Sequence, residues 1–322
     1  MKVVFAVGML ALALPLVAGA HEVYVLSATT IAHDLALVSP NPFGAFWTNQ
    51  FQFFFWGCIA AVLVSTVFFM SITHRLERLF KPALLRLKPY APLVARLTLG
   101  ACLVACGWYG AFFGPELPFS AFGAWAAYVS WAFYLCGALI LWGRGLVPAA
   151  LLALALYTLA LAHWGWYPFI TYANYLGEML LIVLLAWSAK RFEAYAFLAL
   201  RAFFGLSLVG ASVYAKFIHS QLALDVVSQY HLTNYFPFDP LFIVLGAGII
   251  EFLAGFFIMV GFEVRHTSLF LLFWLILSLV YFQESVWPHL VLAGVLVALF
   301  MRGYDRFTLQ GWFFGPKHEP FL

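Results

Sequence analysis

The sequence predicts an all-α polytopic membrane protein, and three observations support this prediction. Of its 322 residues 65% are hydrophobic and 9% are charged, whereas about 25% of an average soluble domain is charged. The apolar residues are gathered into about nine runs, each long enough to cross a bilayer of about 30 Å. Lysine and arginine are concentrated in every second connection between these runs, as expected of a chain that crosses a membrane repeatedly.

The first element is a targeting segment, residues 1–20. Lys2 supplies a positive charge, 3–17 form an apolar run, and Ala18 and Ala20 are the small residues of a signal-peptidase site. The apolar run is short for a spanning helix. We predict a cleavable signal peptide and an extracytoplasmic segment, 21–51, that begins at His21. The alternative is an uncleaved membrane anchor.

The membrane spans follow in order along the chain. The first span and a basic cytoplasmic loop, "THRLERLFKPALLRLKP", together occupy 52–91. The predicted spans are 52–73, 92–113, 120–143, 146–164, 169–188, 194–218, 239–262, 267–284 and 286–303.

Charge orients these spans, because the cytoplasmic loops of membrane proteins are enriched in lysine and arginine. With the mature N-terminus outside, the basic connections all fall inside and Lys216 alone remains outside. We predict a protein of the bacterial inner (cytoplasmic) membrane, with a cytoplasmic tail at 308–322. The basic first loop is explained by this topology and by anionic lipid, so no nucleic-acid partner is expected.

Several function classes lack their motifs in this sequence. No glycine-rich phosphate loop, Ser-His-Asp pattern or Cys-x-x-Cys-His haem attachment site is present. The four cysteines lie inside apolar runs, where they are expected to be small buried hydrophobic residues rather than a disulfide framework.

The chain repeats itself after the first span. "RLTLGACLVACGWYG" (96–110) aligns with "RAFFGLSLVGASVYA" (201–215), and "GALILWG" (137–143) aligns with "GFFIMVG" (255–261). Both units end in Arg-Phe and run in the same direction. We therefore predict one leading span followed by two parallel four-helix repeats, a degenerate one at 92–193 and a second at 194–307.

The second repeat carries the polar residues. Lys216 and Glu251 stand where the first repeat has Ala111 and Phe133, so the first repeat is expected to be mainly scaffold. An ionisable side chain in a membrane helix is costly and usually faces a partner or a cavity. In one interpretation Glu251 pairs with Arg201 as a structural clamp. In the other it exchanges protons with a bound quinone or substrate.

This second unit resembles the DoxX family of four-helix membrane proteins. The resemblance rests on Arg201-x3-Gly205, Lys216, Glu251-x3-Gly255, Gly261 and Arg265, and the repeat extends it weakly back to about residue 92. The family includes the DoxD-type subunit of thiosulfate:quinone oxidoreductase and proteins linked to redox stress or to the maturation of other enzymes. The resemblance implies redox work at the membrane, with quinone as the candidate cofactor.

Further polar residues collect at the predicted outer ends of the spans. We expect His219 and His289 to relay protons and to join Glu251, Lys216 and Arg201 as catalytic residues. Residues expected to bind a cofactor are Glu284, His163 and Asn174. The alternative for each histidine is an ordinary interfacial side chain.

A metal site is predicted at the mature N-terminus. Cleavage after Ala20 would give His21 a free amine beside its imidazole, a bidentate nitrogen chelate suited to Cu(II). Further nitrogen ligands could come from His33 or His231, or from the two outer histidines named above. In the alternative, "HEVYVLS" docks on the outer surface as a short extended segment.

The function expected from these features is a redox subunit that passes reducing equivalents from an extracytoplasmic donor to membrane quinone. Lys216 would orient an anionic group, and the partner would be a periplasmic redox protein or a larger membrane complex. The alternative is a non-catalytic membrane anchor or maturation partner for a periplasmic protein, with a copper protein as one candidate, and in this alternative Glu251 tolerates glutamine. A transporter is disfavoured because the inner half of the spans has few polar residues.

Overall fold

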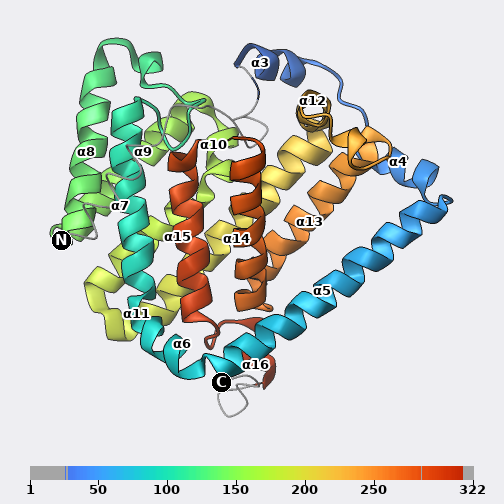
Figure 1. Ribbon diagram of the computed structural model, residues 1–322. Coiled ribbons are helices and arrows are strands. Elements are labelled where there is room, and N and C mark those ends of the chain that lie inside the picture. Colours follow the sequence, from blue (N-terminus) through green and yellow to red (C-terminus); the bar gives the residue numbers. More distant parts are fainter. Residues whose placement is uncertain (1–25, 27, 284, 315–322) are drawn as a thin grey trace.

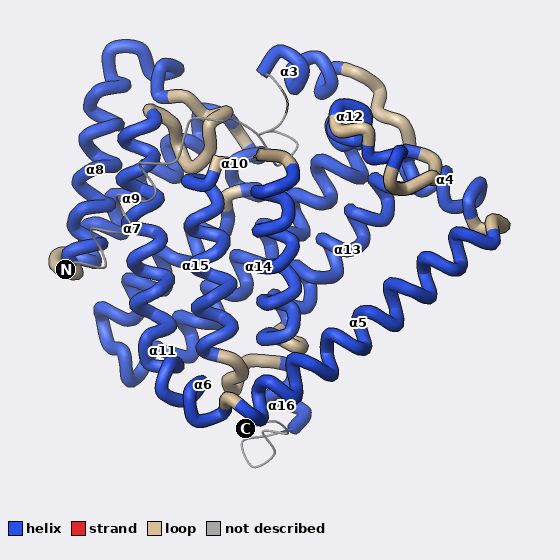
Figure 2. The backbone as a smooth tube through the Cα atoms, in the orientation of Figure 1, coloured by secondary structure: helices blue, strands red, loops and turns tan. Residues whose placement is uncertain are grey.

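The computed structural model of the protein describes residues 26, 28–283 and 285–314. Helices and their connections make up this part of the chain, with no β-strand among the described residues (Figure 2). The all-α prediction is therefore confirmed.

Seven helical segments are long and apolar enough to cross a membrane, which identifies the chain as a polytopic membrane protein. They are α5 (Phe53–Leu79); Lys81–Tyr109, which contains α6 (Lys81–Leu87) and α7 (Ala91–Tyr109); Phe119–Trp142, which contains α8 (Ala126–Trp142); α9 (Leu146–Trp164); Arg191–Ile218; α13 (Pro240–Val260); and α14 (Val264–Tyr281). The other two predicted spans, 169–188 and 286–303, coincide with shorter apolar helices, Ala173–Ser188 and α15 (Val286–Arg302).

The long helix α11 (Ala173–Ser212) consists of two antiparallel parts. Ser188 has non-helical backbone angles (φ −161°, ψ 98°), which break the helix at the connection predicted after residue 188. The two parts then pack closely, since a Cβ atom on Gly177 would lie 3.1 Å from the Cα atom of Leu200. A π-helical turn, η3 (Val213–Ile218), continues the second part of α11.

Glycines let the first two helices of each unit approach closely. A Cβ atom on Gly137 of α8 would lie 2.7 Å from the carbonyl oxygen of Gly100 on α7. In the second unit, a Cβ atom on Gly205 of α11 would lie 2.5 Å from the carbonyl oxygen of Gly255 on α13. These are the glycines that the sequence alignment paired, and small residues are what close packing in a membrane requires.

An arginine lies against the glycine that ends the second helix of each unit. Gly143 and Gly261 both have left-handed backbone angles (φ 80° and 75°), which favour glycine. The guanidinium of Arg96 lies beside Gly143, and that of Arg201 lies beside Gly261. The aligned arginines thus have the same surroundings.

Helix α5 stands apart from the bundle (Figure 1). Residues 59–69 are exposed on every side of the helix, whereas Phe55 near its start and Thr73 and Glu77 near its end are buried. The apolar middle of α5 therefore contacts the surrounding membrane, and only its two ends are fixed to the rest of the protein.

Short helices cover the two ends of the bundle. At one end are α3 (Ala28–Ala36), α4 (Pro42–Asn49) and α12 (Ser220–Gln229), with α10 (Trp166–Thr171) at the start of α11 (Figure 1). At the other end α16 (Leu309–Phe314) lies beside the end of α5. Helix α15 lies between α7 and α14 and so links the two units.

Candidate functional site

The central feature of the second unit is an ion pair between two neighbouring helices. The Nζ atom of Lys216 lies 2.7 Å from the Oε2 atom of Glu251, and the two side chains are only 10% and 16% exposed. Glu251 occupies the middle of α13, so the pair lies at membrane depth. The structure therefore brings together two of the residues predicted to be catalytic.

The local backbone explains how Lys216 reaches Glu251. Lys216 lies in the π-helical turn η3, whose wider coil changes the direction in which side chains leave the helix. Ser212 donates a hydrogen bond to the carbonyl oxygen of Gly248 (2.7 Å), which holds α11 against α13. A Cβ atom on Gly248 would lie 3.2 Å from the Cβ of Lys216, so glycine there leaves room for the lysine.

Arg201 is not the partner of Glu251, so the structural clamp between these two residues is wrong. Arg201 is 3% exposed and donates a hydrogen bond to the carbonyl oxygen of Phe307 (2.8 Å), with Asp305 as its nearby carboxylate. It therefore fixes the turn after α15, at the opposite end of the span from Lys216. We assign it a structural role rather than the predicted catalytic one.

The first unit has an aromatic core at the corresponding place. Phe133, which aligns with Glu251, is fully buried against Phe112, Phe113 and Phe119, at ring-centroid distances of 5.3, 5.6 and 5.3 Å. Ala111, which aligns with Lys216, is also buried. The two units therefore share their helix crossings and differ in what fills the space between the helices.

His219 lies three residues after Lys216 and ends the π-helical turn. Its backbone N–H donates to the carbonyl oxygen of Tyr214 (2.9 Å), and the two rings lie 4.6 Å apart. Partial burial lowers the pKa of His219, which favours the neutral imidazole. Its Nδ1 atom has no hydrogen-bond partner among the described residues, so it remains available to a ligand or a water molecule.

The other predicted outer-face residues do not meet at this ion pair. The Nδ1 atom of His289 lies 2.8 Å from the carbonyl oxygen of Ser285 in its own helix. The ring of His163 contacts Phe122 and Trp164 in the first unit. Glu284 lies outside the described residues.

The predicted copper ligands are not gathered either. His33 and His231 are exposed, and the Nδ1 atom of His33 lies 3.2 Å from a carboxylate oxygen of Asp34. Across the described ranges, no group of three or more histidine, cysteine, aspartate or glutamate side chains is placed to hold a metal. His21 is outside these ranges, so the copper chelate stays a prediction.

Asn174, predicted to bind a cofactor, borders a small cavity. The cavity has a volume of about 20 Å³, room for about one water molecule, and is too small for a quinone ring. It lies where the start of α11, its second half and the start of α15 meet, and its polar lining residues are Thr171, Tyr172, Asn174, Tyr175 and Ser207. The hydroxyl group of Ser207 donates to the carbonyl oxygen of Thr171, and its oxygen lies 3.4 Å from the side-chain oxygen of Asn174.

Glu178 was missed at the sequence level. It is 1% exposed, and neither of its carboxyl oxygens has a hydrogen-bond partner among the described residues. The sequence does single out Glu178, because it is an acidic residue inside the predicted span 169–188, just as Glu251 is an acidic residue inside the predicted span 239–262.

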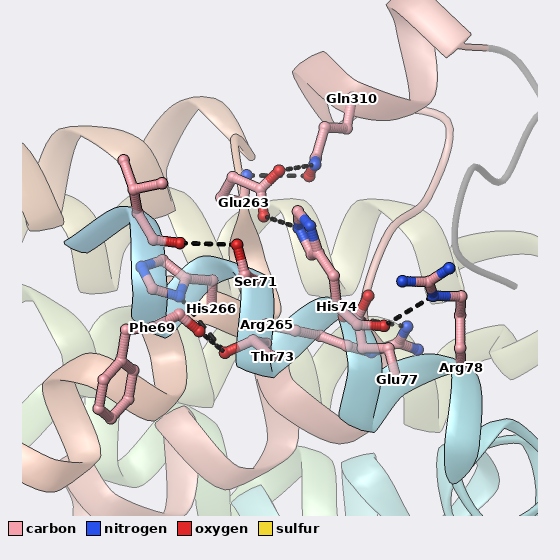
Figure 3. Close-up of polar contacts among 11 residues, drawn as sticks. Phe69, Ser71, Thr73, His74, Glu77, Arg78, Glu263, Arg265, His266 and Gln310 are labelled. Carbon is pink, nitrogen blue, oxygen red and sulfur yellow. Dashed lines mark hydrogen bonds and ion pairs between the residues drawn. The ribbon is translucent and has the colours of Figure 1, made fainter. Parts of the chain in front are cut away.

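A polar network at the C-terminal end of α5 was also missed. His74 contacts Glu263 (3.1 Å), Glu263 accepts a hydrogen bond from Gln310 (2.8 Å), and Arg265 lies 3.6 Å from Glu77 (Figure 3). These residues come from α5, from the start of α14 with the residue that precedes it, and from α16. The network therefore holds together three segments that are far apart in the sequence.

Comparisons with protein-family models, curated proteins and solved structures found no match to this chain. The resemblance to DoxX proteins therefore rests on the residues of the second unit alone.

Proposed function

We propose that the protein is a DoxX-like redox subunit of the bacterial inner membrane, which passes reducing equivalents from an extracytoplasmic donor to membrane quinone. The observation that supports this function best is the ion pair between Lys216 and Glu251 at membrane depth. Reduction of a quinone to a quinol takes up two electrons and two protons. The electrons come from the donor, and the protons are transferred to the quinone from the ion pair.

The ion pair has the chemistry that this role requires. The ammonium group of Lys216 can donate a hydrogen bond to a quinone oxygen and then its proton, while Glu251 holds the lysine in place. Because each quinone takes up two protons, the lysine must regain its proton twice in each turnover, and His219, which ends the π-helical turn three residues after Lys216, supplies it from the outer side. Ile218 (56% exposed) and Ile250 (41% exposed) are close in sequence to Lys216 and Glu251, which supports approach of a lipid-soluble ligand from the bilayer.

We place this site in a topology of nine spans, with the N-terminus outside and the C-terminus in the cytoplasm. The predicted positive-inside pattern supports this orientation. The matching glycine crossings, together with the matching contacts of Arg96 and Arg201, support two parallel four-helix units after the leading span. The first unit then serves as scaffold.

Quinone binding by the purified protein tests this function. Decylubiquinone, a quinone with a short tail, would be titrated into the detergent-solubilised protein while tryptophan fluorescence is followed. We expect saturable quenching that is lost in Glu251→Gln and Lys216→Met. The matched control is Glu193→Gln, because Glu193 pairs with Arg302 at the same 2.7 Å distance but is far more exposed. Undiminished binding by Glu251→Gln would contradict the proposal.

A second candidate function is that of a membrane anchor for a periplasmic protein. The outer end carries large exposed apolar side chains, including Trp47 (67% exposed), Phe51 (87%) and Tyr235 (67%), which favour a protein partner or the membrane interface. This candidate gains support if Glu251→Gln retains function in the cell while substitutions at these positions abolish it.

A further inference from the structure

The interior of the first half of α11 contains a carboxyl group that the proposed quinone site does not use. Glu178 is 1% exposed and has no hydrogen-bond partner for either oxygen among the described residues. Among the described residues, no lysine, arginine or histidine forms an ion pair with it. An ionised carboxylate in such a place is far more costly than the neutral acid, so Glu178 holds a proton.

A polar cavity lies one helical turn from this carboxyl group. Asn174 and Glu178 are four residues apart and therefore share one face of α11, about 6 Å apart along its axis. The side-chain nitrogen of Asn174 also lacks a partner among the described residues. The cavity beside it has room for about one water molecule, which can accept a hydrogen bond from this nitrogen.

A hydrogen bond joins one lining residue of the cavity to a second carboxyl group, in the loop that follows α7. Tyr172 lines the cavity, and its hydroxyl group donates a hydrogen bond to Glu116 in the loop that follows α7. Glu116 is half-buried, whereas Tyr172 is 3% exposed. Polar groups therefore extend from the outer loop to within one helical turn of Glu178.

We propose that Glu178 is a buried proton-binding site, connected to the outer face through Asn174, one water molecule in the cavity, Tyr172 and Glu116. The site lies in the first unit and against the start of α15, apart from the Lys216–Glu251 pair. It binds a proton whether or not the protein reduces quinone, so the two proposals fail independently.

Infrared spectroscopy of the purified protein at neutral pH tests the protonation of Glu178. The wild-type protein should show the carbonyl stretch of a protonated carboxylic acid, and Glu178→Gln should lose this band. Glu178→Leu should lose it as well and leaves no unpaired polar group, so it serves if the glutamine variant fails to fold. Glu193→Gln should keep the band. A wild-type protein without the band, or a Glu178→Gln protein that keeps it, would overturn the proposal.

Transfer of the protein into D2O tests the route, because deuteration shifts the same band to lower frequency. We expect the shift to become severalfold slower in Tyr172→Phe, which removes the hydroxyl link, and in Asn174→Leu, which removes the side-chain donor beside the cavity. Tyr157→Phe is the matched control, since the hydroxyl group of Tyr157 bonds the carbonyl oxygen of Phe169 and does not line the cavity. If the band shifts as fast in Tyr172→Phe and Asn174→Leu as in the wild-type protein, the proposed proton route to the outer face is refuted.

Discussion

The Nζ atom of Lys216 lies 2.7 Å from the Oε2 atom of Glu251 and joins a π-helical turn at the end of one span to the middle of the next. The aligned positions in the first unit, Ala111 and Phe133, are buried and apolar. The second unit therefore keeps an ion pair that the bundle does not need for packing, since the first unit packs without one. This contrast is why we place function at the pair.

Removal of one partner should destabilise the protein more than removal of both. Lys216→Met leaves Glu251 without its cation, and breaking a buried pair in this way costs about 3–5 kcal/mol. The double variant Lys216→Met/Glu251→Leu should recover much of this loss. Thermal unfolding in detergent of the two single variants and the double variant measures the coupling. Strictly additive effects would show that the two side chains do not interact.

The glycine crossing of the second unit should not tolerate a methyl group. In Gly205→Ala the new Cβ atom would lie 2.5 Å from the carbonyl oxygen of Gly255, so the helices must separate. Such overpacking costs about 1–3 kcal/mol. Gly246→Ala is the control on α13, because a Cβ atom there meets nothing within 4 Å. Unfolding temperatures should fall for Gly205→Ala alone, and equal values for the two variants would contradict this crossing.

The attachment of the C-terminal end of α5 to the bundle should depend on Glu77. Arg265 is fully buried, and Glu77→Gln takes away its carboxylate at a cost of about 3–5 kcal/mol. We expect α5, which is fixed only at its ends, to become more accessible to protease near this end. Arg78→Ala is the neighbouring control, since Arg78 is exposed and, among the described residues, bonds only a carbonyl oxygen of its own helix. The same cleavage rate in both variants would mean that the network does not hold α5.

Contact between α3 and α12 should weaken as pH rises. Burial raises the pKa of Asp225 above its usual value of 3.8, against a hydrogen bond from Gln221, and the nearby carboxyl group of Asp34 raises it further. A raised pKa means that the folded state favours the protonated acid. Its stabilising contribution is complete below pH 3.8 and is lost as pH rises through the raised value.

Protection of the α3 amides against hydrogen exchange, corrected for intrinsic rates, measures this effect between about pH 4 and about pH 8. Asp225→Asn should flatten the decrease in protection. Asp239→Asn should leave it unchanged, because asparagine replaces aspartate well at the start of α13. Protection of the α3 amides that increases with pH in the wild-type protein would contradict this explanation.

The choice of partner for Glu251 shows where sequence reasoning reached its limit. Arg201 and Lys216 are 15 residues apart on one predicted helix, so a regular helix directs them within about 60° of each other and leaves both available. The π-helical turn contains more residues per turn than a regular α-helix, so the α-helical period does not predict the direction of Lys216. This turn brings Lys216 to α13. Arg201 meanwhile bonds Phe307, a residue 106 positions away whose place depends on the whole bundle.

The sequence by itself determined the helical class, the order of the apolar segments and the alignment that pairs Gly100 with Gly205 and Gly137 with Gly255. These features follow from hydropathy and residue size, which act over a few turns of one helix. Only the tertiary structure decided that Glu251 pairs with Lys216, that Glu178 is buried beside a small polar cavity, and that His74 meets Glu263. Each of these contacts joins or encloses side chains from separate helices, and its geometry depends on how those helices cross.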